Sequence, residues 1–165
     1  MILMTMPGGR CHAQLGGDTF VAERFHDVLL VDQGGKVRRT IRRKPNGNWL
    51  DILSQVALGT DGSIAILSDL SVDLYESNGD PIRTIPLPEV IGRFPRFTYD
   101  GNHLVIAAEC GMLLLDKTGN GIGMLTTAQW EDPKNEYWTP FLIDDSRELL
   151  LFDGGASRVY RYKMP

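Results

Sequence analysis

The chain has 165 residues, 42% of them hydrophobic, which suits one domain with a packed core. Its formal net charge of −4 argues against general attraction to nucleic acid, so we expect no specific nucleic-acid partner. No apolar stretch approaches the length that is needed to span a bilayer.

The amino-terminal strip 1–6 is apolar but has no basic leader, and Pro7-Gly8-Gly9 follows it at once. The strip is too short for the core of a signal peptide, so by default we expect a soluble, cytoplasmic protein. Cys11 and Cys110 lie 99 residues apart, which fits neither a disulfide framework nor a zinc cluster. The three histidines fall in different parts of the chain without metal-ligand spacing. We therefore expect no metal site and no cofactor.

One repeat recurs four times along the chain. The first apolar residues after successive hairpin turns are 44, 40 and 45 residues apart, at Phe20, Ile64, Leu104 and Leu149. A second turn marker keeps a similar step, at Gly35, Gly79 and Gly119. A period in the low forties, with several short strands in each unit, is typical of β-propeller blades.

The second unit shows the predicted blade most clearly. Asp61-Gly62 supplies a tight hairpin, and a second turn contains Gly79. Four short apolar strands are expected around these turns, at 56–58, 64–67, 72–75 and 82–85. The third unit repeats this plan, and the first unit follows it more loosely.

We predict an all-β fold: a single β-propeller domain, 1–165, of about four four-stranded antiparallel blades. The predicted blades cover approximately 9–44, 52–88, 94–127 and 138–165. The fourth unit supplies only three predicted strands before the chain reaches Pro165. We therefore predict that an amino-terminal strand, residues 2–6, completes the last blade of its own ring or of a partner's ring.

Known propeller repeats are similar to this pattern. The segment from Gln55 through Ile85 resembles an NHL-type repeat, and the segment from Phe97 through Asn102 resembles the inner hairpin of TolB- or WD40-type blades. The resemblance covers nearly the whole chain, but its motifs concern blade geometry and not chemistry. Such propellers usually have six or more blades. The four repeats depart from this number, which leaves a tight four-bladed ring, an eight-bladed ring made by two chains, or an open half-ring that a partner completes, as for a fragment of a larger propeller.

The innermost strands should line a central channel, where propeller enzymes gather their ligands. Alternation along these strands predicts which side chains face the channel. The channel candidates are His12, Gln14, Arg96 and Thr98. The predicted channel positions include no carboxylate, whereas a calcium-dependent hydrolase of this type needs several oxygen ligands. We therefore lean against an enzyme. The alternative is a lactonase-like hydrolase whose channel another chain completes, with Asp69 and Glu109 as further contributors.

The segment from Lys36 to Lys44 holds six cations in nine residues. Its arginines are candidates for partner binding: Arg38, Arg39, Arg42 and Arg43. They could dock an acidic or phosphate-rich partner, including lipid headgroups in a peripheral contact. The simpler interpretation, which we favour, is an outer strand whose charges prevent pairing with another sheet.

Aromatic residues lie in the connections that lead into the inner strands. We expect Trp49, Phe94 and Trp138 to cover the seams between blades, with a contact role as the alternative. The longest connection combines aromatic and acidic residues, which suits a protein interface. Its candidate contacts are Trp130, Glu131, Asp132 and Tyr137.

These observations predict a noncatalytic interaction or assembly subunit. Packed blades would hold its loops rigid for a protein partner or a larger complex. A homodimer that completes one ring is a further partner to consider. The identity of the partner stays open at this point.

Overall fold

The structure is a computed structural model, and its described residues form fifteen strands in four antiparallel sheets. The residues it describes are 10–12, 19–24, 26–50, 53–68, 70–89, 95–108, 111–126, 138–143, 148–153 and 158–163. The chain divides into two compact units, Met1–Ile85 and Pro86–Pro165, and each is described by itself.

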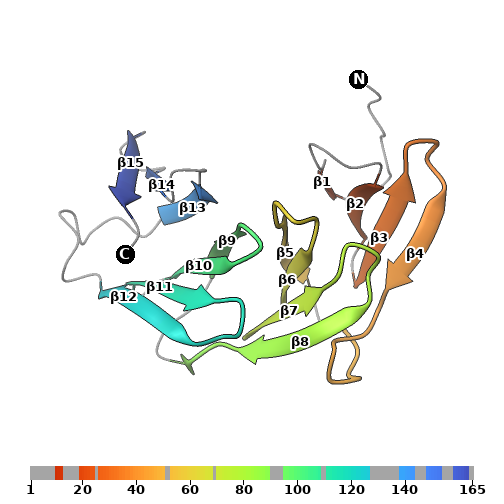
Figure 1. The fold of residues 1–165 in the computed structure, drawn as a ribbon, viewed down its shortest axis with the longest axis horizontal. Helices are drawn as coiled ribbons and strands as arrows, with labels where there is room; N and C mark the ends of the chain where they lie inside the picture. The colour runs from red at the N-terminus through yellow and green to blue at the C-terminus, as the bar shows by residue number, and fades with distance from the viewer. Residues whose placement is uncertain are drawn as a thin grey trace. The chain divides into compact units, whose positions relative to one another are not determined.

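The first unit contains two four-stranded sheets (Figure 1). The strands of the first sheet, in spatial order, are β1 (Arg10–His12), β2 (Thr19–Arg24), β3 (Asp27–Asp32) and β4 (Val37–Ile41). Those of the second sheet are β5 (Leu53–Leu58), β6 (Ile64–Ser68), β7 (Ser71–Tyr75) and β8 (Pro81–Pro86). In both sheets the strands lie side by side in the order in which they follow one another along the chain, because tight hairpins connect consecutive strands.

One apolar cluster joins these two sheets. Its buried members come from the six strands β2 to β7 and from the connection before β5: Val21, Val28, Leu30, Ile41, Leu50, Val56, Ile64, Ile66 and Tyr75. Every residue of β6 and β7 is buried. Strands with both faces covered lose the alternation of apolar and polar residues, which explains the continuous apolar sequence of β6.

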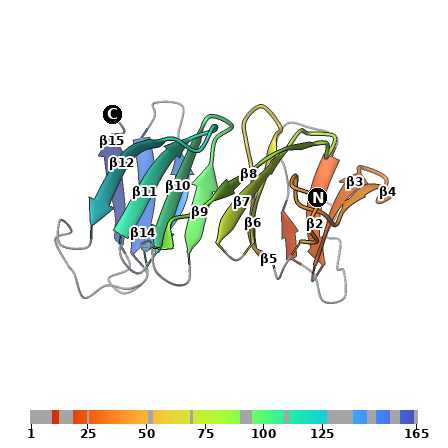
Figure 2. The same cartoon turned by 90° about the horizontal axis from the view of Figure 1, so that it is seen from below.

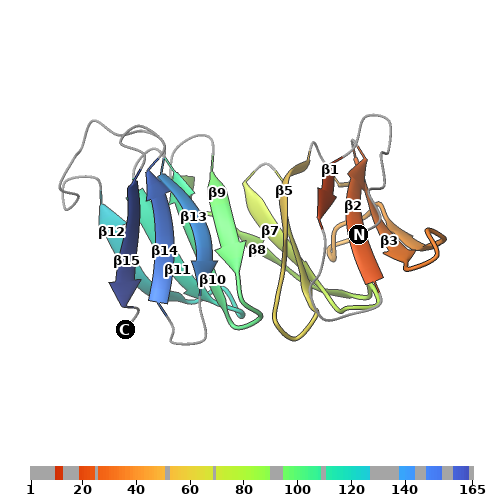
Figure 3. The same ribbon diagram turned by 90° about the horizontal axis from the view of Figure 1, so that it is seen from above.

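The second unit contains a four-stranded and a three-stranded sheet (Figures 2 and 3). The first comprises β9 (Arg96–Tyr99), β10 (His103–Ala108), β11 (Gly111–Asp116) and β12 (Gly121–Thr126). The other comprises β13 (Trp138–Ile143), β14 (Glu148–Asp153) and β15 (Arg158–Lys163). The two sheets share a cluster of Val105, Ala107, Met112 and Leu149, with Leu114 and Tyr160 packed against it.

The same turn connects the third and fourth strands in three of the sheets. Its glycine has a φ of 82° at Gly35, 84° at Gly79 and 90° at Gly119. This left-handed conformation is accessible to glycine without a steric penalty. A three-residue loop that ends on such a glycine is a common hairpin connection, so the predicted turn marker is confirmed as a repeated structural element.

The all-β fold of four antiparallel sheets is confirmed. The four strands predicted for the second repeat lie within β5 to β8, and the described part of the fourth repeat forms three strands, β13 to β15. The strip 2–6 lies outside the described residues, so its role as the missing fourth strand stays a prediction.

Candidate functional site

The basic segment forms β4, the outer strand of the first sheet. Val37, Arg38 and Arg39 are all exposed, and Ile41 points into the core. This is the placement that the simpler interpretation of the basic run predicted, because charged side chains on an edge strand oppose pairing with another sheet.

Three of the four candidate arginines form ion pairs with acidic residues, which neutralise their charge. Arg38 Nε lies 2.7 Å from Asp32, Arg39 Nη1 lies 2.7 Å from Asp80, and Arg42 Nε lies 3.2 Å from Asp27. The amide of Lys36, together with Arg38, holds the pKa of Asp32 below its usual value. The surface of β4 therefore carries much less net positive charge than its sequence suggests.

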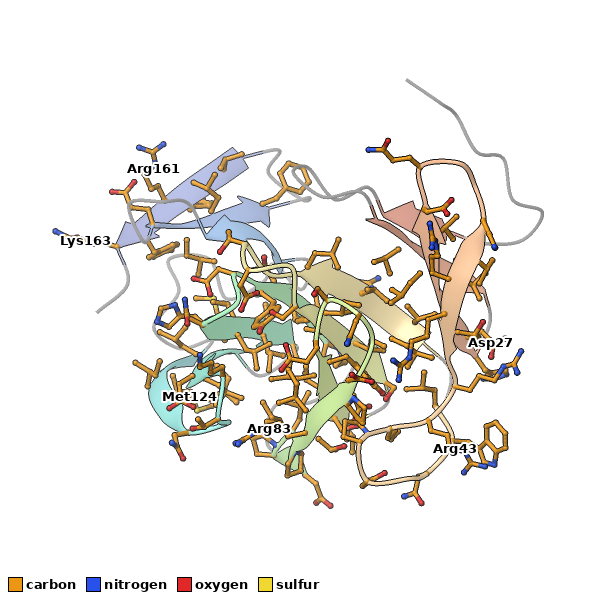
Figure 4. The ribbon with its side chains drawn as sticks, turned by 45° about the vertical axis from the view of Figure 1, so that its right-hand side comes forward. Asp27, Arg43, Arg83, Met124, Arg161 and Lys163 are labelled. Carbon is orange, nitrogen blue, oxygen red and sulfur yellow. The ribbon has the colours of Figure 1, made fainter. Side chains whose placement is uncertain are left out.

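Arg43 differs from these three arginines in its contacts. Its guanidinium carbon lies 4.2 Å from the ring centroid of Trp49, and its Nη1 donates a hydrogen bond of 2.9 Å to the carbonyl of Gly47. No carboxylate of the described residues pairs with it. Figure 4 shows Arg43 extending outward from the ribbon. The pair presents a cation and a large aromatic surface together.

The residues from 42 to 50, called here the 42–50 hairpin, hold this pair in place. Arg43 and Trp49 form a β-bridge, and the turn between them is closed by hydrogen bonds from Lys44 N to Asn48 O and from Gly47 N to Lys44 O. At its base, Leu50 N donates to Arg42 O, and the Leu50 side chain is buried.

The core also anchors this hairpin. The hydroxyl of Tyr75 donates a hydrogen bond of 2.7 Å to the carbonyl of Arg43, and Lys44 Nζ lies 3.3 Å from Ser71 Oγ. Burial, reinforced by the carboxylate of Asp73, raises the pKa of Tyr75 well above its usual value. The phenol therefore stays protonated and can donate this hydrogen bond.

Trp49 is 61% exposed, so the expectation that it covers a seam between blades is wrong. The hairpin turns its indole outward, where Arg43 covers one face of the ring. This pairing was not predicted, although the sequence contains a turn signal between the two residues. Asn46-Gly47 is a turn signal, and the three-residue loop 45–47, which ends on Gly47 with a φ of 90°, places Arg43 and Trp49 opposite each other.

Most other predicted site residues are not brought together by the structure. Arg96 is exposed at the start of β9, whereas Thr98 is buried two residues later. For His12, the structure describes only the backbone, in β1. The remaining candidates lie outside the described residues: Gln14, Asp69, Phe94, Glu109, Trp130, Glu131, Asp132 and Tyr137. Their roles stay predictions. Trp138 begins β13, but the structure does not describe its side chain.

The described carboxylates of the inner turns, Asp61 and Asp100, accept hydrogen bonds within their own turns. Asp100 accepts hydrogen bonds from the amides of Asn102 and His103, and its other oxygen lies 2.9 Å from His103 Nδ1. Asp61 likewise accepts from the amide and hydroxyl of Ser63. Within the described parts of the chain, no three His, Cys, Asp or Glu residues are placed to hold a metal ion. No described helix is long and apolar enough to cross a membrane.

A second surface feature lies in the second unit, between its two sheets. It is an apolar groove of about 280 Å³. Its lining comes from five strands: Val105, Met112, Leu114, Gly123, Met124, Leu149, Tyr162 and Lys163. Met124 and Lys163 are labelled in Figure 4. The groove was not predicted from the sequence.

Comparison with solved structures identifies the fold. Virginiamycin B lyase from Staphylococcus aureus is 13% identical, with a TM-score of 0.64 over 93% of this chain. A streptogramin B lyase is 12% identical, with a TM-score of 0.60 over 89% of this chain. BBS1N, solved in complex with ARL6DN, is 11% identical, with a TM-score of 0.65 over 94% of this chain. The fold is that of a β-propeller.

The chain spans about half the length of these propellers, covering 54%, 51% and 50% of the respective chains. A Bacteroides caccae protein of unknown function is also similar, at 11% identity and a TM-score of 0.62, and 66% of its chain is covered. No protein-family model matches this chain, and no curated protein matches it. At these identities the propeller likeness shows the fold alone. The set contains both lyases and a propeller bound to another protein, so the fold is compatible with either role.

Proposed function

We propose that this protein is a noncatalytic β-propeller module that binds a protein partner through loops held rigid by its packed sheets. The observation that carries the proposal is the 42–50 hairpin, where Arg43 and Trp49 are exposed yet fixed by hydrogen bonds. Trp and Arg are enriched among the residues that dominate binding energy at protein interfaces. Because the pair is already ordered, binding does not have to immobilise it.

The chemistry of the pair favours an acidic protein segment as the partner. Arg43 keeps its charge without a carboxylate partner among the described residues, whereas Arg38, Arg39 and Arg42 each have one. A carboxylate of the partner could accept hydrogen bonds from the guanidinium while an apolar side chain packs on the indole. The arginines of β4 then form the rim of the proposed contact, where ion pairs add little affinity.

The loop that contains Trp130, Glu131, Asp132 and Tyr137 is the second part of the proposed interface. This part rests on the sequence alone, because aromatic residues beside acidic ones suit an interface. We treat it as a separate contact with its own test.

We also propose that the protein acts in an assembly. Completion of one ring by a second copy of this chain is part of this proposal. One of the similar propellers, BBS1N, was solved in complex with another protein, which supports a binding role for this fold.

Trp49→Ala tests the main contact. The substitution should weaken binding of an acidic protein partner at least about tenfold, because it removes the apolar surface and frees Arg43 to move. Ile82→Ala is the matched control, since Ile82 is also an exposed apolar residue of the same unit. The measurement is quantitative affinity capture with wild-type and both variant baits, followed by titration calorimetry with the captured partner. Thermal unfolding should be unchanged for Trp49→Ala because the side chain is exposed.

Equal affinity for wild type and Trp49→Ala would exclude the 42–50 hairpin as the contact. Trp130→Ala separates the two parts of the interface. If only Trp130→Ala weakens binding, the partner contacts the second loop and the hairpin assignment is wrong.

A further inference from the structure

The groove of the second unit lies beside a position at which the repeats differ. The fourth residue after the turn glycine is an arginine in the first two sheets, Arg39 and Arg83, but a glycine in the third, Gly123. The sheet register supports this equivalence. Arg39 lies opposite Leu30 and Gly123 lies opposite Leu114, each next to a bulge. The third sheet therefore has no side chain where the other two have a long one.

The first unit shows what the long side chain does at this position. Arg39 reaches the turn between β7 and β8, where its Nη1 lies 3.2 Å from Asn78 O and 2.7 Å from a carboxylate oxygen of Asp80. In the second unit, a Cβ built at Gly123 meets no atom within 4 Å, and the groove opens beside it. The replacement of a long, charged side chain by glycine therefore accounts for both the space and the apolar character of the groove.

The walls of the groove suit an aliphatic chain. Val105, Leu114 and Leu149 supply branched apolar surface. Met112 and Met124 add thioether side chains, which are flexible enough to follow the shape of a ligand. The volume of about 280 Å³ is close to the lower end of the range of small-molecule pockets. The groove can therefore hold a small aliphatic ligand.

One cation belongs to this groove. Lys163, the last residue of β15, is exposed and contributes to the lining. Glu148 lies opposite Lys163 in the sheet register, but its ion pair is with Arg161, at 3.1 Å. No carboxylate of the described residues forms an ion pair with Lys163. The methylenes of a lysine extend an apolar surface while its ammonium group stays in water, so the groove combines an apolar wall with one positive charge.

We propose that the groove binds a free, medium-chain amphiphile, an unbranched aliphatic chain that ends in a carboxylate. The chain lies on the apolar wall beside Gly123, and its carboxylate accepts a charge-assisted hydrogen bond from Lys163 Nζ. Burial of the methylenes supplies most of the affinity, whereas the head group fixes the orientation of the ligand. The groove belongs to the other unit than the 42–50 hairpin, so this inference is independent of the proposed function.

Octanoate is the probe for the test, with 1-octanol as its neutral counterpart and hexanoate as a shorter chain. The measurement is an NMR titration of the full chain, labelled at the methyl groups of its methionines. Octanoate should shift the methyl signals of Met112 and Met124, since both side chains line the groove. Hexanoate should bind about tenfold more weakly, because two methylenes fewer are buried.

Two substitutions separate the head group from the chain. Lys163→Met removes the charge and should weaken octanoate binding about two- to fivefold, with no change for octanol. Lys117→Met is its control, because Lys117 is an exposed lysine of the same unit that does not line the groove. Gly123→Leu fills the groove and should weaken both ligands at least about tenfold. Gly121→Leu should not, because its Cβ also meets nothing within 4 Å but Gly121 is not part of the lining.

Three results would overturn the inference. Methyl signals of Met112 and Met124 that do not respond to millimolar octanoate would reject the groove as a ligand site. Octanoate binding that is unchanged in Lys163→Met, or that falls only as much as octanol binding does, would reject an anionic ligand. Binding that survives Gly123→Leu would place the ligand elsewhere. Circular dichroism of each variant checks that the sheets remain folded.

Discussion

Gly79 and Gly47 are two turn glycines with nearly the same backbone conformation and different surroundings. Their φ angles are 84° and 90°, both in the left-handed region. A Cβ at Gly79 would lie 2.9 Å from Cδ of Arg39 and 3.1 Å from a methyl carbon of Leu30, whereas a Cβ at Gly47 meets nothing within 4 Å. Arg39 therefore packs closely against the turn of the next sheet.

Gly79→Ala and Gly47→Ala measure that packing. Gly47→Ala should cost about 1–2 kcal/mol of unfolding free energy, from the left-handed conformation alone. Gly79→Ala should cost more, because Arg39 must also move. The measurement is urea unfolding of both variants. In an Arg39→Ala background the difference between the two should shrink, and equal costs in the wild-type background would show that Arg39 does not pack as described.

Single residues were predictable from sequence where the signal was local. The glycine turns and the charged surface of β4 followed from short patterns. The acidic residues that pair with the arginines were not predicted, because such partners can be distant in sequence: Asp80 lies 41 positions from Arg39 in the chain. The exposure of Trp49 was predicted wrongly for the same reason: Tyr75, which anchors the hairpin at Arg43, belongs to another sheet.

At the scale of elements, β6, β7 and β8 are joined by a buried carboxylate. Asp73 of β7 is fully buried; it accepts hydrogen bonds from Ser68 Oγ at 3.0 Å and from Thr84 Oγ1 at 2.6 Å. A buried acid is tolerated only when its oxygens are hydrogen-bonded. The apolar periodicity predicted these strands well, but it could not show that Asp73 points inward, since that depends on hydroxyls supplied by two neighbouring strands.

Thr84→Val tests this junction. The substitution keeps the shape of the side chain but removes the donor to Asp73, so it should destabilise the first unit by about 1.5–3 kcal/mol. Thr84→Ser keeps the hydroxyl and is the control. Chemical denaturation midpoints of the two variants provide the comparison. If valine and serine lower the midpoint equally, the hydrogen bond to Asp73 does not contribute as claimed.

For the whole molecule, recurrence of the turn glycines and apolar strands was enough to predict a propeller fold. Recurrence could not locate the groove, because that feature depends on a position where the repeats differ, Arg39 in one sheet and Gly123 in another. The 42–50 hairpin is likewise a departure from the repeat, on a scaffold that the repeated sheets build.

Hydrogen–deuterium exchange of the 42–50 hairpin would show whether Arg43 and Trp49 are held in place before a partner binds. Mass spectrometry would follow a peptide that contains residues 42–50, in the free protein and with the captured partner. We expect slow exchange of the amides of Lys44, Gly47 and Leu50 already in the free protein, because each donates a backbone hydrogen bond within the hairpin, and slower exchange still when the partner is bound. Fast exchange of these amides in the free protein, or no change when the partner binds, would contradict the proposed contact.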